Sequence, residues 1–130
     1  MFVSETLSWS SAQAYCENIN GRLAEPRTLK EYLFVRSIWE DFGSGIHMWL
    51  GGSKTQNEGR YVWLTDSQPV ENEAFNVWAE GEPNNYKGNE DCLEFSHHEA
   101  SSLGFNDRDC DFSQKFVCEI LHTACDNRCV

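Results

Sequence analysis

The sequence has no long apolar run, and no stretch approaches the ~18 residues that a membrane-spanning helix needs. Its first residues, Met1 to Thr6, also lack the charged start and apolar stretch that mark an export signal. We therefore expect no membrane insertion, and we interpret the chain as a mature or trimmed product.

Basic side chains are few. The 10 Lys and Arg residues stand against 21 Asp and Glu, which gives a formal net charge of −11. Such a charge repels phosphate backbones and anionic lipid headgroups, so nucleic acid is not an expected partner. An acidic surface can concentrate divalent cations, although it can also serve only to keep the protein soluble.

Catalytic motifs are missing as well. The adjacent residues His97, His98 and Glu99 do not share one helical face, and the HExxH spacing of metal hydrolases is absent. No Gly-x-Ser-x-Gly turn and no phosphate-binding glycine-rich loop occurs. We therefore expect a protein that is not an enzyme.

Cysteine, in contrast, is plentiful. An even number of cysteines in a chain of 130 residues is typical of a disulfide framework formed in an oxidising compartment. We therefore expect a secreted, extracellular protein. The residues alone allow about 15 pairings and do not choose among them. The cysteines are Cys16, Cys92, Cys110, Cys118, Cys125 and Cys129.

Two helices are expected in the first third of the chain. One begins near Ser10 or Ser11 and ends at Gly21, which is placed to adopt the left-handed conformation. Thr28 and Glu31 form a capping box that begins the second, and Gly43 follows its last turn. The first helix should turn Ala14, Tyr15 and Ile19 inward. The second should bury Leu29, Leu33, Val35, Ile38, Trp39 and Phe42.

Short strands are expected after the helices. They are HMWLGG from His47, RYVWLT from Arg60, DCLEFS from Asp91 and KFVCEIL from Lys115. Helices followed by strands favour an α+β domain, with two helices flanking antiparallel sheets, over an alternating βαβ arrangement. The polar stretch 65–90 between them is expected to be a long ordered loop, anchored by Phe75, Val77 and Trp78.

Oxygen-bearing side chains gather in two stretches. GEPNNYKGNEDC, residues 81–92, contains Glu82, Asn84 and Glu90, and GFNDRDC, residues 104–110, contains Asn106 and Asp107. Calcium takes six to eight oxygen ligands, from carboxylates, amide carbonyls, the backbone and water. If Cys92 and Cys110 are bridged, the two stretches meet at one end of the sheet. The sequence therefore predicts a calcium site made from these five side chains.

Four short motifs match a known family: MWLGG at Met48 to Gly52, Glu82-Pro83-Asn84, Glu90-Asp91-Cys92, and Phe105-Asn106-Asp107, where the family usually has Trp-Asn-Asp. With its spaced cysteines, the chain resembles C-type lectin carbohydrate-recognition domains from Phe2 to about Ile120. The match is specific because Glu90 stands eight residues after Glu82, with Asn106-Asp107 and then Cys110 following.

The resemblance implies disulfides Cys16–Cys118 and Cys92–Cys110. It also implies that the ion and the sugar share one set of residues: Glu82, Asn84, Glu90, Asn106 and Asp107. In the family, Glu-Pro-Asn accompanies mannose-type sugars such as mannose, N-acetylglucosamine and fucose. Glycans of glycoproteins or microbial surfaces are then the expected partners, with innate immunity or cell recognition as the biological setting.

Two alternatives remain open at this stage. Trp78 or Tyr86 could stack on a sugar and hold galactose in a reversed pose, or either could be a packing or solvent-facing residue. A module of the same fold could instead bind a protein or an ice surface, although such modules commonly lose a calcium ligand, and all five ligand positions are intact here.

An auxiliary calcium, found in many relatives, would use Glu58, Asn85, Glu90 and Asp91. Lys54 stands where those relatives have an aspartate, and its ammonium would compete with the ion. That argues against a filled auxiliary site, unless Lys54 points to solvent.

The chain is divided into a recognition domain, residues 1–121, and a short tail, residues 122–130. The tail cysteines, Cys125 and Cys129, are spaced to form a small intrachain loop, which we favour. The alternative is a link between two chains, giving a homodimer. Oligomers are common among lectins because multivalency raises the affinity of weak sugar sites.

Overall fold

The computed structural model describes residues 1–42, 46–54, 60–70, 78, 91–97 and 103–120. Among these residues, no helix is long and apolar enough to cross a membrane. The elements in chain order are β1 (Phe2–Leu7), α1 (Trp9–Asn18), β2 (Gly21–Leu23), α2 (Leu29–Asp41), β3 (Met48–Ser53), β4 (Val62–Trp63), β5 (Cys92–His97), β6 (Leu103–Arg108) and β7 (Gln114–Ile120).

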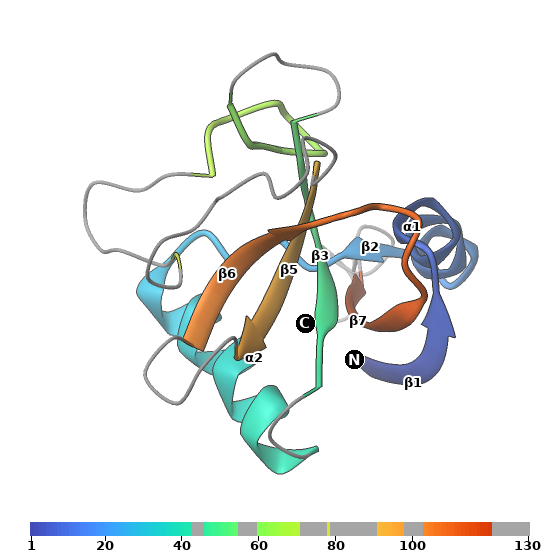
Figure 1. Ribbon diagram of the computed structural model, residues 1–130, viewed down its shortest axis with the longest axis horizontal. Helices are drawn as coiled ribbons and strands as arrows, with labels where there is room; N and C mark the ends of the chain where they lie inside the picture. Colours follow the sequence, from blue (N-terminus) through green and yellow to red (C-terminus); the bar gives the residue numbers. More distant parts are fainter. Residues whose placement is uncertain (43–45, 55–59, 71–77, 79–90, 98–102, 121–130) are drawn as a thin grey trace, which may run out of the picture.

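The strands form a sheet in the order β1-β7-β3-β5-β6, with β2 paired to β7 and β4 paired to β3. The central pair, β3 and β7, is parallel, and the other strand pairs are antiparallel. The sheet is therefore mixed rather than wholly antiparallel. Figure 1 shows α1 and α2 on opposite sides of the sheet, which confirms the α+β class.

The first helix forms as expected but faces the core differently. Ala12 and Cys16 are its buried residues, whereas Ala14 is exposed, so the expectation for Ala14 was wrong. The left-handed residue is Asn20, with φ of 61°, and not Gly21. Gly21 lies in β2, where a Cβ atom would be 2.4 Å from the carbonyl oxygen of Glu119 in β7. A glycine is needed there for close strand approach rather than for helix termination.

The second helix begins with the predicted capping box. The backbone N–H of Glu31 donates to Thr28 Oγ1 over 3.1 Å, and the backbone N–H of Thr28 donates to Glu31 Oε1 over 3.2 Å. Val35 and Trp39 are buried as expected, with Ile38 partly buried. The inward face also includes Tyr32, and the predicted core residues Leu29, Leu33 and Phe42 are exposed.

Alternation along β3 divides the core into two clusters. Met48 and Leu50 pack in the cluster that contains Tyr32 and Trp39 of α2. Trp49, between them, packs in the cluster of α1, because successive side chains of a strand point to opposite faces of the sheet. The disulfide Cys16–Cys118, which the resemblance implied, lies in this second cluster and ties α1 to β7.

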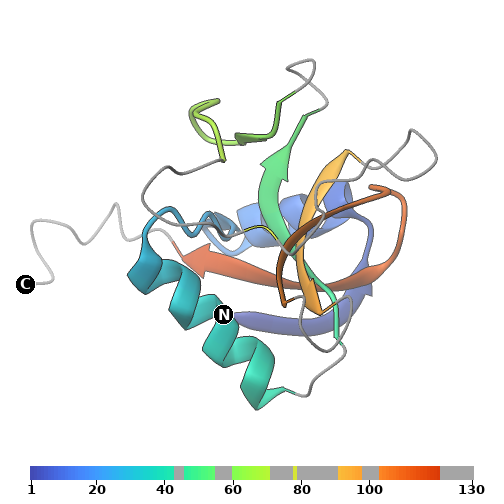
Figure 2. The same cartoon turned by 60° about the vertical axis from the view of Figure 1, so that its left-hand side comes forward.

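The four expected strands correspond to β3, β4, β5 and β7, although β4 has only two residues. The strands β1, β2 and β6 were not predicted. Of the expected long loop, the structure describes residues 65–70 and Trp78, and the anchors Phe75 and Val77 lie outside the described residues. The described part follows β4 and lies beyond the end of β3 (Figure 2).

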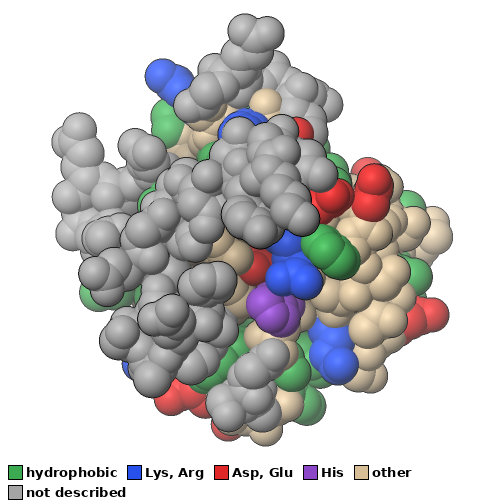
Figure 3. All heavy atoms as spheres, viewed as in Figure 1, with side chains coloured by type: hydrophobic (Ala, Val, Ile, Leu, Met, Phe, Trp, Pro, Cys, Tyr) green, Lys and Arg blue, Asp and Glu red, His purple; other side chains and the backbone are tan. Residues whose placement is uncertain are grey.

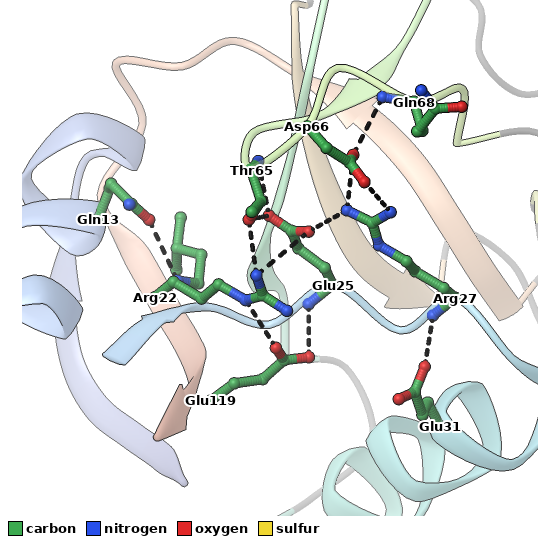
Figure 4. Close-up of polar contacts among 10 residues, drawn as sticks. Gln13, Arg22, Glu25, Arg27, Glu31, Thr65, Asp66, Gln68 and Glu119 are labelled. Atoms are coloured by element: carbon green, nitrogen blue, oxygen red, sulfur yellow. Dashed lines mark hydrogen bonds and ion pairs between the residues drawn. The ribbon is translucent and has the colours of Figure 1, made fainter. Parts of the chain in front are cut away.

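A buried carboxylate, Glu25, joins three parts of the chain (Figure 4). Its Oε1 accepts from Arg27 Nη2 over 2.5 Å, and its Oε2 accepts from the hydroxyl of Thr65 over 2.6 Å and from the Thr65 backbone N–H over 3.1 Å. Its own backbone N–H donates to Glu119 Oε1 over 2.8 Å. The segment between β2 and α2, the turn after β4 and the end of β7 are thereby held together.

Candidate functional site

The β5–β6 hairpin carries the described part of the predicted site. Its antiparallel register places Leu93 opposite Asp107 and Glu94 opposite Asn106. The disulfide Cys92–Cys110 joins its end, with 5.2 Å between the Cα atoms, as the resemblance implied. The hairpin therefore places Asp107 and Asn106 opposite the two residues that follow Cys92, the end of the oxygen-rich stretch 81–92.

The remaining predicted ligands, Glu82, Asn84 and Glu90, lie outside the described residues, so the set of five stays a prediction. Within the described parts of the chain, no group of three or more His, Cys, Asp and Glu side chains could hold a metal ion. Also outside the described residues are Glu58, Asn85, Tyr86, Cys125 and Cys129.

Of the two polar side-chain atoms of Asn106, one forms a hydrogen bond with the described part of the chain and the other does not. The residue is 7% exposed, and its Nδ2 donates to Glu94 Oε2 over 2.5 Å. Its Oδ1 is buried and has no hydrogen-bond partner among the residues that the structure describes. Buried polar atoms are nearly always paired, so an unpaired amide oxygen indicates an ordered water or a bound ion. A hard cation such as calcium fits it, because amide and carboxylate oxygens are its preferred ligands, and the fully buried Asp107 is the next residue.

Glu94 lies behind Asn106 and is fully buried. Its Oε1 accepts from His47 Nδ1 over 2.9 Å and from Gln114 Nε2 over 3.1 Å, and lies 4.0 Å from Arg108 Nε. Burial by itself would raise the pKa of Glu94, but the hydrogen bond and charge of His47, the Asn106 amide and the charge of Arg108 hold this pKa below its ordinary value. Glu94 is therefore ionised at neutral pH.

The Glu94 network was missed from the sequence. Its one signal is a carboxylate at the centre of the otherwise apolar and small residues of CLEFS, at a position where a strand buries its side chains. Acidic residues are almost never fully buried unless they are paired, so this glutamate had to have partners. Those partners, from β6, β7 and the residue before β3, come from distant parts of the chain.

A hollow of about 270 Å³ opens beside this network, lined in part by His47, Arg108, Gln114 and Lys115. In Figure 3 the histidine and basic side chains gather near the centre of the face shown. The hollow gives solvent access to His47 while Glu94 behind it stays buried. His47 is therefore partly exposed to solvent, whereas Glu94 and Asn106 are buried.

The aromatic residues near the hairpin pack on one another. Trp78 forms a bridge with Phe105, with the two ring centroids 6.1 Å apart, and its ring lies 5.3 Å from that of Tyr61. Phe105 is fully buried at the position where the family usually has tryptophan. These contacts favour the packing interpretation of Trp78, and its stacking on sugar stays a prediction.

Lys54 lies beside one residue of the expected auxiliary site. Its Nζ is 3.8 Å from Asp91 Oδ1, and its ammonium lies 5.6 Å from the centre of the Tyr61 ring. Lys54 is thus directed at a carboxylate rather than into open solvent. An ammonium paired with Asp91 supports the expectation that the auxiliary calcium set, of which only Asp91 is described, stays empty.

Comparison with known proteins agrees with this arrangement. Residues 5–120 match the family model described as Lectin C-type domain. The chain is 31% identical over 124 residues to Salivary C-type lectin 2 of Aedes albopictus, which covers 91% of this chain and 80% of that protein. Several other relatives are much longer, and the chain spans 20 to 28% of their length.

Two solved structures share the fold. The mouse scavenger receptor C-type lectin carbohydrate-recognition domain is 26% identical, with a TM-score of 0.73, over 90% of this chain and 83% of that one. The lectin SPL-2 of Saxidomus purpuratus, described as a Ca²⁺-independent C-type lectin, is 26% identical, with a TM-score of 0.78, over 98% of this chain and 86% of that one.

Proposed function

Because this chain belongs to the C-type lectin domain family, we propose that it is a calcium-dependent lectin that binds mannose-type sugars. The single observation that carries the proposal is Asn106 Oδ1, a buried amide oxygen without a hydrogen-bond partner among the described residues, on the residue that precedes the fully buried Asp107. The proposed role is binding and not catalysis, and the proposed setting is extracellular.

The proposed ion site combines Asn106 and Asp107 with Glu82, Asn84 and Glu90. A bound calcium ion supplies coordination positions for two neighbouring sugar hydroxyls. Each hydroxyl would donate to a carboxylate oxygen and accept from an asparagine NH₂, so both of its hydrogen-bonding roles are satisfied. Asn106 can take part because its NH₂ has two hydrogens and Glu94 needs only one of them.

A glycan array probed with the purified protein tests this proposal, first with calcium and then with a chelator. We expect binding to mannose, N-acetylglucosamine or fucose ligands, and its loss on chelation, because the sugar contacts pass through the ion site. Chelator-sensitive binding to galactose would keep calcium dependence and overturn the mannose assignment.

The variant Asp107→Ala sharpens the same test. It removes one predicted ligand, so glycan binding should fall below detection while the fold, followed by circular dichroism, is retained. Retained glycan binding would show that the site lies elsewhere.

The competing function is recognition without calcium, by a protein-binding or ice-binding module. The observation in its favour is the fold shared with SPL-2, which is described as Ca²⁺-independent. Glycan binding that survives the chelator would show recognition without calcium, and a folded protein that binds no glycan in either condition would favour a protein or an ice surface as the target.

A further inference from the structure

We infer that Glu94 is a positioning residue for the proposed ion site: it fixes the side-chain amide of Asn106 so that Oδ1 faces the ion. The inference rests on the proposed function, and it concerns a residue outside the five predicted ligands. It is carried by the hydrogen bond between Asn106 and Glu94 and by the partners that hold Glu94.

The orientation follows from what each group can donate or accept. An ionised carboxylate only accepts hydrogen bonds, and of the two ends of an asparagine amide only the NH₂ donates. Asn106 must therefore turn Nδ2 toward Glu94, as the 2.5 Å contact shows. A flipped amide would place its oxygen against the carboxylate and present hydrogens to a cation, which is unfavourable on both sides.

Glu94 can serve as this reference because it is itself fixed. Its Oε1 accepts from His47 and Gln114, with Arg108 nearby, so donors and positive charge meet that oxygen and leave Oε2 for Asn106. The side chain is fully buried and cannot turn to solvent. Its position opposite Asn106 is set by the β5–β6 register.

A glutamine in place of Glu94 would keep the shape of the side chain, but it would no longer require Asn106 to donate. Its amide offers both an oxygen and an NH₂, so it can pair with either orientation of Asn106. Residues behind metal ligands orient them, and their loss typically lowers metal affinity about 10- to 100-fold. The substitution Glu94→Gln is therefore the sharpest probe, because it alters hydrogen-bond direction and charge with little change in volume.

Calcium titration by calorimetry on the full chain is the first experiment, comparing wild type, Glu94→Gln and the control Glu25→Gln. The control makes the same change at a second buried carboxylate, in the cluster of Arg27 and Thr65. We expect the Kd for calcium to rise about 10- to 100-fold in Glu94→Gln and to stay within twofold in Glu25→Gln. Equal calcium affinity in Glu94→Gln and wild type would overturn the inference.

The second experiment needs no metal. In nuclear magnetic resonance spectra of the calcium-free protein, the Asn106 side-chain NH₂ should show two widely separated proton signals, one of them shifted by the carboxylate and slow to exchange. In Glu94→Gln the separation should shrink and exchange should accelerate. If the Asn106 NH₂ protons of wild type show the signal separation and fast exchange of a solvent-exposed amide, the inference is overturned.

A third variant covers the case in which Glu94→Gln does not fold. Gln114→Met removes one donor to Oε1 and leaves the Glu94 carboxylate in place. It should raise the calcium Kd in the same direction by a smaller factor, and an unchanged Kd would count against the inference. Wild type that binds no calcium, with the Asn106 NH₂ still held, would refute the proposed function and leave the orientation by Glu94 standing.

Discussion

Glu25 and Glu94 are both buried glutamates held by side chains from distant segments, yet their networks end differently. Glu25 is 2% exposed and Glu94 is fully buried. Both oxygens of Glu25 are met by Arg27 and Thr65, and Arg27 continues to Asp66, which is on the surface (Figure 4). The Glu94 network instead leads, through Asn106, to an oxygen that accepts no hydrogen bond from the described part of the chain.

The difference separates two uses of a buried charge. The Glu25 cluster is closed, because its donors and acceptors pair with one another and its last members reach water. Such a cluster joins segments and contributes to stability. The Glu94 network leaves two buried atoms, Asn106 Oδ1 and Arg108 Nε, without a hydrogen-bond partner among the described residues. The cost of leaving a buried acceptor unpaired is about 1 to 3 kcal/mol. An ordered water or a bound ion can satisfy such an acceptor, and in the proposed site calcium does so.

Breaking the closed cluster should have the largest effect on stability. Glu25→Leu removes the acceptor for Arg27 and Thr65, and removing one partner of a buried ion pair typically costs 3 to 5 kcal/mol. Because Arg27 keeps Asp66 and some solvent contact, we expect a loss of about 3 kcal/mol. Urea unfolding followed by fluorescence measures it.

Glu25→Leu also tests whether the Glu25 cluster is independent of the proposed ion site. Its calcium affinity should remain that of wild type wherever the native state is populated. A Glu25→Leu protein as stable as wild type would show that the cluster is not the stabilising connection proposed here.

Acid should lower the free energy of unfolding by protonating Glu94. The pKa of Glu94 is held below its ordinary value, so its contribution to the free energy of unfolding is complete above the unfolded-state pKa of about 4.3. That contribution is lost as the pH falls through the lower folded-state pKa. Urea midpoints measured from pH 7 down to pH 3 should therefore fall less steeply in Glu94→Gln than in wild type. If the urea midpoints of the two proteins fall in parallel with pH, Glu94 does not have the lowered pKa.

An exposed pair should matter least. The Nζ of Lys54 lies 3.8 Å from an Asp91 oxygen, and both side chains are partly in solvent. Exposed ion pairs contribute about 0 to 1 kcal/mol, so we expect Lys54→Met to change the free energy of unfolding by about 0.5 kcal/mol. The unfolding assay used for Glu25→Leu measures it, and a loss above about 1.5 kcal/mol would place Lys54 with the buried networks.

Local signals predicted local structure. The capping box at Thr28 and Glu31 involves residues three apart, and it forms as the sequence indicates. The apolar face of α2 was harder, because Leu29, Leu33 and Phe34 make the helix apolar on more than one side. Contacts with the sheet select the buried side, where Tyr32 packs on the rings of Phe95 and Phe105.

Features that depend on distant segments could not be predicted in this way. Gly21 was assigned to helix termination because nothing in its neighbourhood shows that β7 approaches it. The strand β6 has a polar sequence, GFNDR, and pairing with β5 makes it a strand. Asn106 and Asp107 were identified from the oxygen-rich stretch that contains them and from motif resemblance. Glu94 belongs to no motif and shows its role only through its partners.

The pairing of Cys16 with Cys118 and of Cys92 with Cys110 has a consequence for a cleaved chain. Both bonds span residues 98–102, which connect β5 to β6. A protease that cuts once in this connection would produce two polypeptides that remain covalently joined at two points. The nicked protein would migrate as one species on a gel without reductant and separate into two fragments only after thiol treatment.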